Sequence, residues 1–269
     1  MQVEPLTPTI GAIVHDLDLR DVVQDDQLFA VVHDHWIRHQ VLFFRDQALS
    51  ATDQLALGER FGPLHIHPAA PYVDDNPALM QIHADADSQR NNGEVWHSDV
   101  SADAEPPMAS ILKIHQMPAT GGDTLWASMY AVYESLSEEV QEWLLDLTAT
   151  HHMSYTGFYG NHTPQRQSPT AVHPVIRTHP VSGQRALFVN RGFTRRINEL
   201  SAAESDVVLA MLFDQVKEPL FHCRFRWTEN AVAIWDNRCT QHLALWDYFP
   251  ETRSGIRVTV QGDRPYLER

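Results

Sequence analysis

Residues 96–101 read WHSDVS and place a histidine and an aspartate two positions apart among bulky apolar side chains. Residues i and i+2 of a β-strand point to the same face, so a strand here would hold the His97 imidazole beside the Asp99 carboxylate. Such a pair would supply two ligands of a metal site. A surface turn is the alternative interpretation, because one H-x-D spacing is unremarkable in a chain with 16 histidines.

His242 is the candidate for a third ligand. It ends the phrase WDNRCTQH, residues 235–242, which follows the apolar run of a predicted buried strand. Two histidines and one carboxylate on one side of a divalent ion leave three positions open, which is the ligand set of non-haem Fe(II) oxygenases. Zinc accepts the same ligands, and a lone histidine is more often packed or exposed than bound to metal. The residue pattern alone therefore leaves the metal open.

The composition restricts the class of protein. The chain has 269 residues, 43% of them apolar, which is enough for one large or two small domains with a real core. Asp and Glu outnumber Lys and Arg by 35 to 20, and this charge argues against partners such as nucleic acid or an anionic membrane. A small anionic substrate would need a local cluster of Arg or His. The two cysteines and the lack of a visible signal peptide or membrane span favour a cytoplasmic location.

Short strand-like runs outnumber helical ones. Helices are predicted at 50–62, 137–149 and 201–216 from capping signals and apolar periodicity. Strands are predicted at 39–47, 109–117, 173–180, 185–190, 223–228, 231–237 and 256–262. This pattern favours a mainly β fold, a sandwich or jelly roll, with peripheral helices. Residues 155–170 are polar with Gly and Pro, which is typical of a mobile loop.

Several longer phrases occur in a specific order along the chain, namely WHSDVS, PATGGDTLWASMYAVYESLS, HPVIRTHPVSGQRALFVN, AIWDNRCTQH and RVTVQGDRP. With them the sequence resembles the taurine dioxygenase family of Fe(II)/2-oxoglutarate-dependent dioxygenases over nearly its whole length. The resemblance implies one domain, residues 1–269, with a double-stranded β-helix (jelly-roll) core and a mobile lid at about 155–170. It also implies Fe(II), with 2-oxoglutarate and O2 as co-substrates, and a homo-oligomer, either a dimer or a tetramer.

The resemblance also implies a role for each candidate site residue. The metal ligands would be His97, Asp99 and His242; Thr124 and Arg253 would hold the distal carboxylate of 2-oxoglutarate; and His67 and Arg257 would bind the substrate anion. The side-chain chemistry agrees, because arginine stays charged and offers a planar fork to a carboxylate. The pair His65-x-His67 is a competing metal site, which we weigh lower because the family places this segment at the substrate.

Three positions depart from the family pattern and leave the substrate open. Ala70 stands where taurine dioxygenases have a tyrosine, Gly93 stands near an asparagine position, and Thr156 and Gly157 replace a Ser-Phe pair. We therefore expect a small organic anion other than taurine, such as another sulfonate, a sulfate ester, a phosphonate or a carboxylate. Two other functions stay open at this point, a jelly-roll metal-dependent hydrolase with the same triad and a non-catalytic ligand-binding relative.

Overall fold

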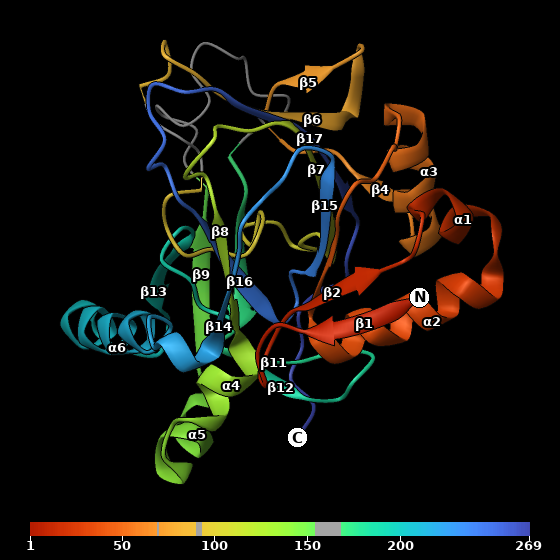
Figure 1. The fold of residues 1–269 in the computed structure, drawn as a ribbon. Helices are drawn as coiled ribbons and strands as arrows, with labels where there is room; N and C mark the ends of the chain where they lie inside the picture. The colour runs from red at the N-terminus through yellow and green to blue at the C-terminus, as the bar shows by residue number, and fades with distance from the viewer. Residues whose placement is uncertain (69, 90–92, 154–167) are drawn as a thin grey trace.

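A sheet of nine strands forms the largest layer of the computed structural model, which describes residues 1–269 except 69, 90–92 and 154–167 (Figure 1). The strands run in the order β1–β2–β3–β15–β7–β17–β6–β5, and β4 pairs with β17. Their bounds are β1 Gln2–Pro5, β2 Ala12–His15, β3 Val41–Phe44, β4 Leu64–His65, β5 Tyr72–Val73, β6 Asn76–Ala84, β7 Ala109–Gln116, β15 Ala231–Asp236 and β17 Arg253–Val260.

The described residues also form three smaller sheets. The first has the order β14–β8–β16, with β14 His222–Phe225, β8 Thr124–Ser128 and β16 Thr240–Ala244. The second has the order β10–β9–β13, with β9 Thr148–His152, β10 Thr170–Pro174 and β13 Thr194–Ile197. The third pairs β11 Ile176–Thr178 with β12 Arg185–Leu187, and Gly183 adopts φ +71° in the turn between them.

Strand β3 of the large sheet is apolar along its whole length because both of its faces are covered. In β3, Phe43 packs into the core shared with Trp126 of β8 and Trp235 of β15, whereas Leu42 and Phe44 face the core beneath the N-terminal helices. Alternate residues of one strand thus enter two different cores. This explains why the segment reads as an unbroken apolar run instead of a polar–apolar alternation.

The helices lie at the periphery (Figure 1). Helices α1 Leu19–Gln24, α2 Asp26–His39 and α3 Ala51–Phe61 precede or cover the large sheet, and α4 Met129–Glu134, α5 Glu138–Leu144, α6 Ala202–Gln215 and the 3-10 helix η1 Pro219–Phe221 accompany the smaller sheets. Capping boxes begin α3 at Ser50 and α6 at Ser201, as the sequence predicts. Within the described residues, no helix has both the length and the apolar character to cross a membrane.

The mainly β jelly-roll fold with peripheral helices is confirmed, but several details differ from the sequence prediction. The helix predicted at 137–149 ends at Leu144, and the chain enters β9 at Thr148, where Glu199 accepts hydrogen bonds from the Thr148 amide and hydroxyl. The strand predicted at 173–180 divides into parts of β10 and β11, which belong to different sheets, and β1, β2, β4–β6, β8, β9, β13 and β16 were not predicted. Helices α1, α2 and α4 were not predicted. The predicted lid at 155–170 lies mostly outside the described residues.

A buried ionic network anchors the turn that leads from β15 in the large sheet to β16 in the small one. The Asp236 carboxylate accepts hydrogen bonds from Arg238 Nη2 at 2.6 Å and from Arg238 Nε at 2.9 Å, and its Oδ2 lies 3.0 Å from His179 Nε2. Burial alone would raise the pKa of Asp236, but Arg238 and His179 outweigh it and the net pKa lies below the usual range. The turn therefore depends on one ionised carboxylate.

We expect Asp236→Asn to lower the free energy of unfolding by about 3 kcal/mol or more, because Arg238 would stay buried without its counter-ion. Chemical denaturation measures this change. Asp146→Asn is the matched control, since Asp146 pairs with Arg269 while both side chains are about 70% exposed, and its midpoint should stay close to wild type. Equal midpoints for the two variants would show that the buried network does not stabilise the turn.

Candidate metal centre

Consecutive residues of the WHSDVS segment attach to the chain around His242. Backbone hydrogen bonds join His97 N to His242 O at 3.2 Å and His242 N to His97 O at 2.9 Å. Ser98 Oγ donates to the Thr240 carbonyl at 2.7 Å, and the Asp99 amide donates to the Asn237 side chain at 3.3 Å. These bonds bring a late part of the chain against an early one.

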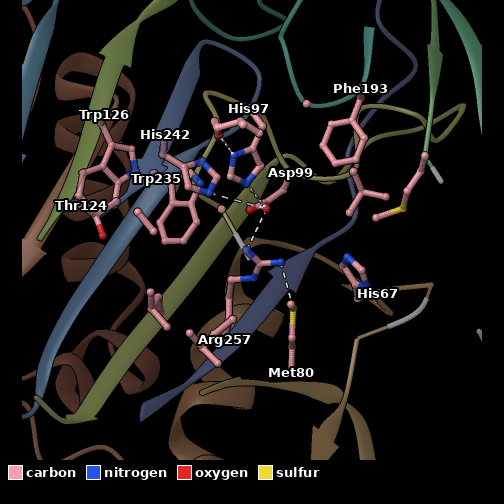
Figure 2. A pocket seen from close by; sticks show the side chains of 18 of the residues that line it. His67, Met80, His97, Asp99, Thr124, Trp126, Phe193, Trp235, His242 and Arg257 are labelled. Carbon is pink, nitrogen blue, oxygen red and sulfur yellow. Dashed lines mark hydrogen bonds and ion pairs between the residues drawn. The ribbon is translucent and has the colours of Figure 1, made fainter. Parts of the chain in front are cut away.

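The three candidate ligands converge in one cavity (Figure 2). Asp99 Oδ1 lies 3.8 Å from His97 Nε2 and 3.8 Å from His242 Nε2, and the two imidazole centroids are 4.1 Å apart. One ligand atom from each residue lies within 4.8 Å of the other two. The arrangement matches the two-histidine, one-carboxylate set that the sequence indicated.

The prediction that His97 and Asp99 lie on one face of a β-strand is wrong. His97 makes a single isolated bridge instead of lying in a strand, and Asp99 lies in a turn in which Val100 adopts φ +43°. The two side chains are neighbours because tertiary hydrogen bonds hold each residue against 237–242. Strand alternation therefore has no part in the geometry.

The protonation states suit metal binding. Burial lowers the pKa of His97 and of His242 below the usual histidine value, so both imidazoles are neutral. His97 Nδ1 lies 2.7 Å from the Val95 carbonyl, which places the proton on Nδ1 and leaves a lone pair on Nε2. Burial alone would raise the pKa of Asp99, but Arg257 and the imidazoles lower it below the usual range, so the carboxylate is ionised.

A short chain of hydrogen bonds fixes the Asp99 carboxylate. Ser110 Oγ on β7 donates to Asp99 Oδ2 at 2.7 Å, and Asn237 Nδ2 donates to Ser110 Oγ at 2.9 Å. Asp99 Oδ1 is thereby turned toward the imidazoles. Sequence analysis missed the role of Ser110 and Asn237, although Asn237 stands inside the WDNRCTQH phrase and a buried polar residue so near a ligand was the available signal.

The donor set fits a divalent first-row metal ion. Metal–ligand bonds to imidazole and carboxylate are about 2.0–2.2 Å long, so two atoms bound to one ion lie at most about 4 Å apart. The 3.8 Å separations of Asp99 Oδ1 from both imidazole nitrogens fall inside this limit. A second buried group, His179, Asp236 and Cys239, has similar atom types, but Arg238 and His179 already occupy the Asp236 carboxylate.

A cavity of about 100 Å³ opens beside the triad. All seven residues proposed from the sequence for metal, 2-oxoglutarate and substrate binding line this cavity, and apolar side chains lie between them. The apolar lining comprises Met80, Ile82, Val95, Val100, Leu112, Met153 and Phe193, with Trp126 and Trp235 beside His242. Such a lining excludes water and strengthens electrostatic interactions inside the cavity.

Arg253, at the start of β17, and Thr124, at the start of β8, both line this cavity. Arg253 is 3% exposed, and its Nε donates to the Gly122 carbonyl at 3.1 Å. Among the described residues, no carboxylate lies within 4.0 Å of the Arg253 guanidinium, and neither Nη group has a hydrogen-bond acceptor. Residues 69, 90–92 and 154–167, which are not described, contain no Asp or Glu. Thr124 Oγ1 accepts from Trp227 Nε1 at 3.0 Å, which leaves its own proton available. The pair is ready to bind a carboxylate.

Arg257 and His67 lie on the other side of the metal ligands. Arg257 Nη1 donates to Asp99 Oδ1 at 2.8 Å, whereas Nη2 meets only the weak acceptor Met80 Sδ at 3.0 Å. Arg257 Nε has no acceptor among the described residues. His67 Nδ1 accepts from the Ala70 amide at 2.9 Å, so its proton lies on Nε2. Burial and then Arg257 lower the pKa of His67 to about 3.

Two of the positions that depart from the family pattern, Ala70 and Gly93, can be located in the structure. Ala70 is buried beside His67, and Gly93 lines the cavity with φ +106°. A Cβ at Gly93 would lie 3.6 Å from His97 Cε1, so a larger residue would narrow the cavity next to a ligand. Gly157 lies outside the described residues. His65 bonds to Asp103 at 3.0 Å, which disfavours the competing His65–His67 metal site.

Comparison with known proteins identifies the family. The model of the family described as "Taurine catabolism dioxygenase TauD, TfdA family" matches residues 2–259. An alpha-ketoglutarate-dependent sulfate ester dioxygenase of Pseudomonas putida is 36% identical over 98% of this chain and 91% of its own, and an alkylsulfatase of Acinetobacter baylyi is 32% identical over 98% and 86%. The crystal structure of a taurine dioxygenase from Burkholderia xenovorans superposes with a TM-score of 0.87 at 32% identity, covering 99% of this chain and 92% of that one. The chain therefore belongs to the TauD and TfdA family of dioxygenases.

Proposed function

We propose that this protein hydroxylates a small organic anion and couples the reaction to the oxidative decarboxylation of 2-oxoglutarate, with release of succinate and CO2. The observation that carries the proposal is the presence, in one cavity, of a two-histidine, one-carboxylate triad and a buried guanidinium that has no carboxylate partner among the described residues. The triad fits Fe(II), the metal of the family. Arg253 fits the far carboxylate of the co-substrate.

Each side chain has a specific task in this proposal. His97, Asp99 and His242 bind the ion, and Fe(II) supplies the activation of O2 when it is bound there. Arg253 and Thr124 hold the distal carboxylate of 2-oxoglutarate by charge-assisted hydrogen bonds. Gly122 orients Arg253, because its carbonyl accepts from Nε and directs the fork into the cavity.

Arg257 and His67 are the proposed receptor for the anionic head of the substrate. Arg257 contributes the Nε and Nη2 protons that lack a strong acceptor, and neutral His67 contributes its Nε2 proton. Because Arg257 also binds Asp99, the substrate anion is held next to the metal ligands but not on the metal. The sulfate esters and sulfonates named for the relatives have head groups of this kind.

A hydrolase that uses zinc at the same triad explains the cavity less well. Such an enzyme needs a general base beside the metal-bound water. Asp99 is the only carboxylate that lines the cavity within the described residues, and His67 with a pKa of about 3 is a weak base. A hydrolase also has no use for the second buried arginine. The cytoplasmic location, single-domain organisation and homo-oligomeric state remain predictions from the sequence.

We expect His242→Ala to weaken Mn(II) or Fe(II) binding by at least about 100-fold, because one of three protein ligands is lost. Anaerobic titration calorimetry measures this affinity without relying on turnover. His15→Ala is the control, since His15 is exposed and pairs with Glu4 far from the cavity, and its metal affinity should equal that of wild type. Unchanged affinity in the His242 variant would contradict the assignment of the triad.

We expect Arg253→Gln to raise the KM for 2-oxoglutarate by about 100-fold, since a charge-assisted bidentate contact contributes roughly 2–3 kcal/mol. Succinate release at increasing 2-oxoglutarate concentrations gives this value. Arg226→Gln serves as the control, because Arg226 is an exposed arginine directly before Trp227 and does not line the cavity. Equal KM values in the two variants would place the co-substrate elsewhere.

A panel of sulfonates, alkyl sulfates, phosphonates and carboxylates should identify the substrate class through stimulated succinate release. We expect at least one class to stimulate release several-fold, and Arg257→Ala to abolish most of that stimulation because the anion loses its cation. Metal titration of the same variant is a control that separates substrate binding from damage to Asp99. Normal turnover of the preferred anion by Arg257→Ala would refute the substrate site.

A further inference from the structure

Arg195 is a third arginine of the cavity, and neither the metal nor 2-oxoglutarate accounts for it. It lies on β13, directly after the turn that contains Gly192 and Phe193. A Cβ at Gly192 would lie 2.9 Å from His97 Cβ, so this turn packs against a metal ligand. The Phe193 ring lies 6.2 Å from the His97 ring in an edge-on contact.

The position of this turn places Arg195 on the substrate side. In Figure 2, Thr124 and Phe193 lie on opposite sides of the metal ligands, and His67 lies on the side of Phe193. Thr124 marks the end of the cavity assigned to the 2-oxoglutarate carboxylate. Arg195 lines the same cavity as these residues, and its place two residues after Phe193 puts it on the side of the cavity assigned to the substrate.

The Arg195 guanidinium has only weak partners. Nη1 donates to the Thr194 carbonyl at 3.4 Å and Nη2 to the Gly192 carbonyl at 3.2 Å, both long contacts. No carboxylate of the described residues lies within 4.0 Å of it, and residues 69, 90–92 and 154–167 contain no Asp or Glu.

The charges of the cavity indicate what would complete it. Among the described residues, three guanidinium groups and one carboxylate line it, which is a surplus of two positive charges. A divalent metal ion and the dianion of 2-oxoglutarate cancel each other. A substrate with one negative charge would pair with one of these cations and leave the other, the exposed Arg195, to solvent. A substrate with two separated anionic groups would compensate both Arg257 and Arg195.

We propose that Arg195 is a specificity-determining residue that binds a second anionic group at the far end of the substrate, so that the preferred substrates are dianions with an apolar middle, such as ω-carboxylated alkanesulfonates or alkyl sulfates. This inference rests on the proposed function of the cavity. The head group binds Arg257 and His67, the apolar side chains of the lining contact the carbon chain, and Arg195 binds the far carboxylate. The spacing between the two cations selects the chain length.

The test compares alkanesulfonates of increasing length with their ω-carboxylated counterparts in wild type, Arg195→Gln and Arg196→Gln. Glutamine keeps an N–H for the backbone carbonyls and removes the charge. Arg196 is the matched control, because it is the adjacent exposed arginine of β13, it donates to the Asn198 carbonyl at 3.2 Å, and it does not line the cavity. Succinate release gives kcat and KM for each compound.

We expect wild type to favour the dianion at one or two chain lengths. Arg195→Gln should raise KM for that dianion about tenfold more than for the matched monoanion, with little change in kcat, as expected for a partly exposed charge-assisted contact. Arg196→Gln should affect neither compound. An equal loss on both compounds in Arg195→Gln, or no preference of wild type for the dianion at any length, would overturn the proposal.

A binding measurement keeps this proposal separate from the proposed function. Anaerobic calorimetry with the Fe(II)- and 2-oxoglutarate-loaded protein gives Kd for the same compounds in the three proteins. If no compound stimulates succinate release but the dianion still binds about tenfold more weakly to Arg195→Gln than to Arg196→Gln, the reaction is misassigned and the role of Arg195 stands. If turnover occurs and Kd for the dianion is equal in both variants, the reaction stands and the role of Arg195 is refuted.

Discussion

The attachment of residues 97–99 to residues 237–242 is the constraint on which the site depends. Neither segment could position a metal ion alone, because one contains a turn and the other crosses between two sheets. The backbone bridge between His97 and His242, the Ser98 bond to Thr240 and the Asp99 bond to Asn237 join them at successive residues. Asp236 begins the same turn and fixes it by its buried bonds to Arg238 and His179. The Asp236 network therefore holds the same turn that positions the candidate ligand His242 and the Asp99 partner Asn237.

The electrostatics of the cavity oppose those of the whole chain. The protein carries a formal net charge of −15, yet within the described residues a single carboxylate and three arginines line the cavity. Asp99 serves two cations at once, because its Oδ1 faces the ligand imidazoles and also accepts from Arg257. A carboxylate oxygen has two lone-pair directions, so a metal ion and a guanidinium can share it. In the proposed function, this sharing would fix the position of the substrate anion relative to the metal ion.

Sequence reasoning identified the fold class and the residues that meet in the cavity, but it gave a wrong local reason for one of the central pairs. Apolar runs such as 41–44 predicted buried strands correctly, since both faces of β3 are covered by core residues. The spacing of His97 and Asp99 suggested a strand, whereas Val100 at φ +43° lies in a turn that hydrogen bonds from Ser98 and Asp99 hold against residues 237–242. Ser110, Asn237 and Arg195 were missed for the same reason. Their roles come from contacts between segments far apart in the sequence, which no local pattern encodes.

The residues that line the cavity stand on two different kinds of structure. Thr124, Arg253 and Arg257 stand on β8 and β17, which pair with strands on both sides, and His242 stands on β16, which pairs with β8 and bridges to His97. His67, Ala70, Gly93 and Phe193 stand outside regular strands. Substitutions in such connecting segments disturb few ladder hydrogen bonds, so the surroundings of the cavity at Ala70 and Gly93 can change while the strands that carry Arg253 and Arg257 are retained. The division does not follow the assigned roles, because Arg257 stands on β17 together with Arg253, whereas His97 and Asp99 stand outside regular strands. The strands therefore position the two buried arginines and His242, and the connecting segments shape the space around them.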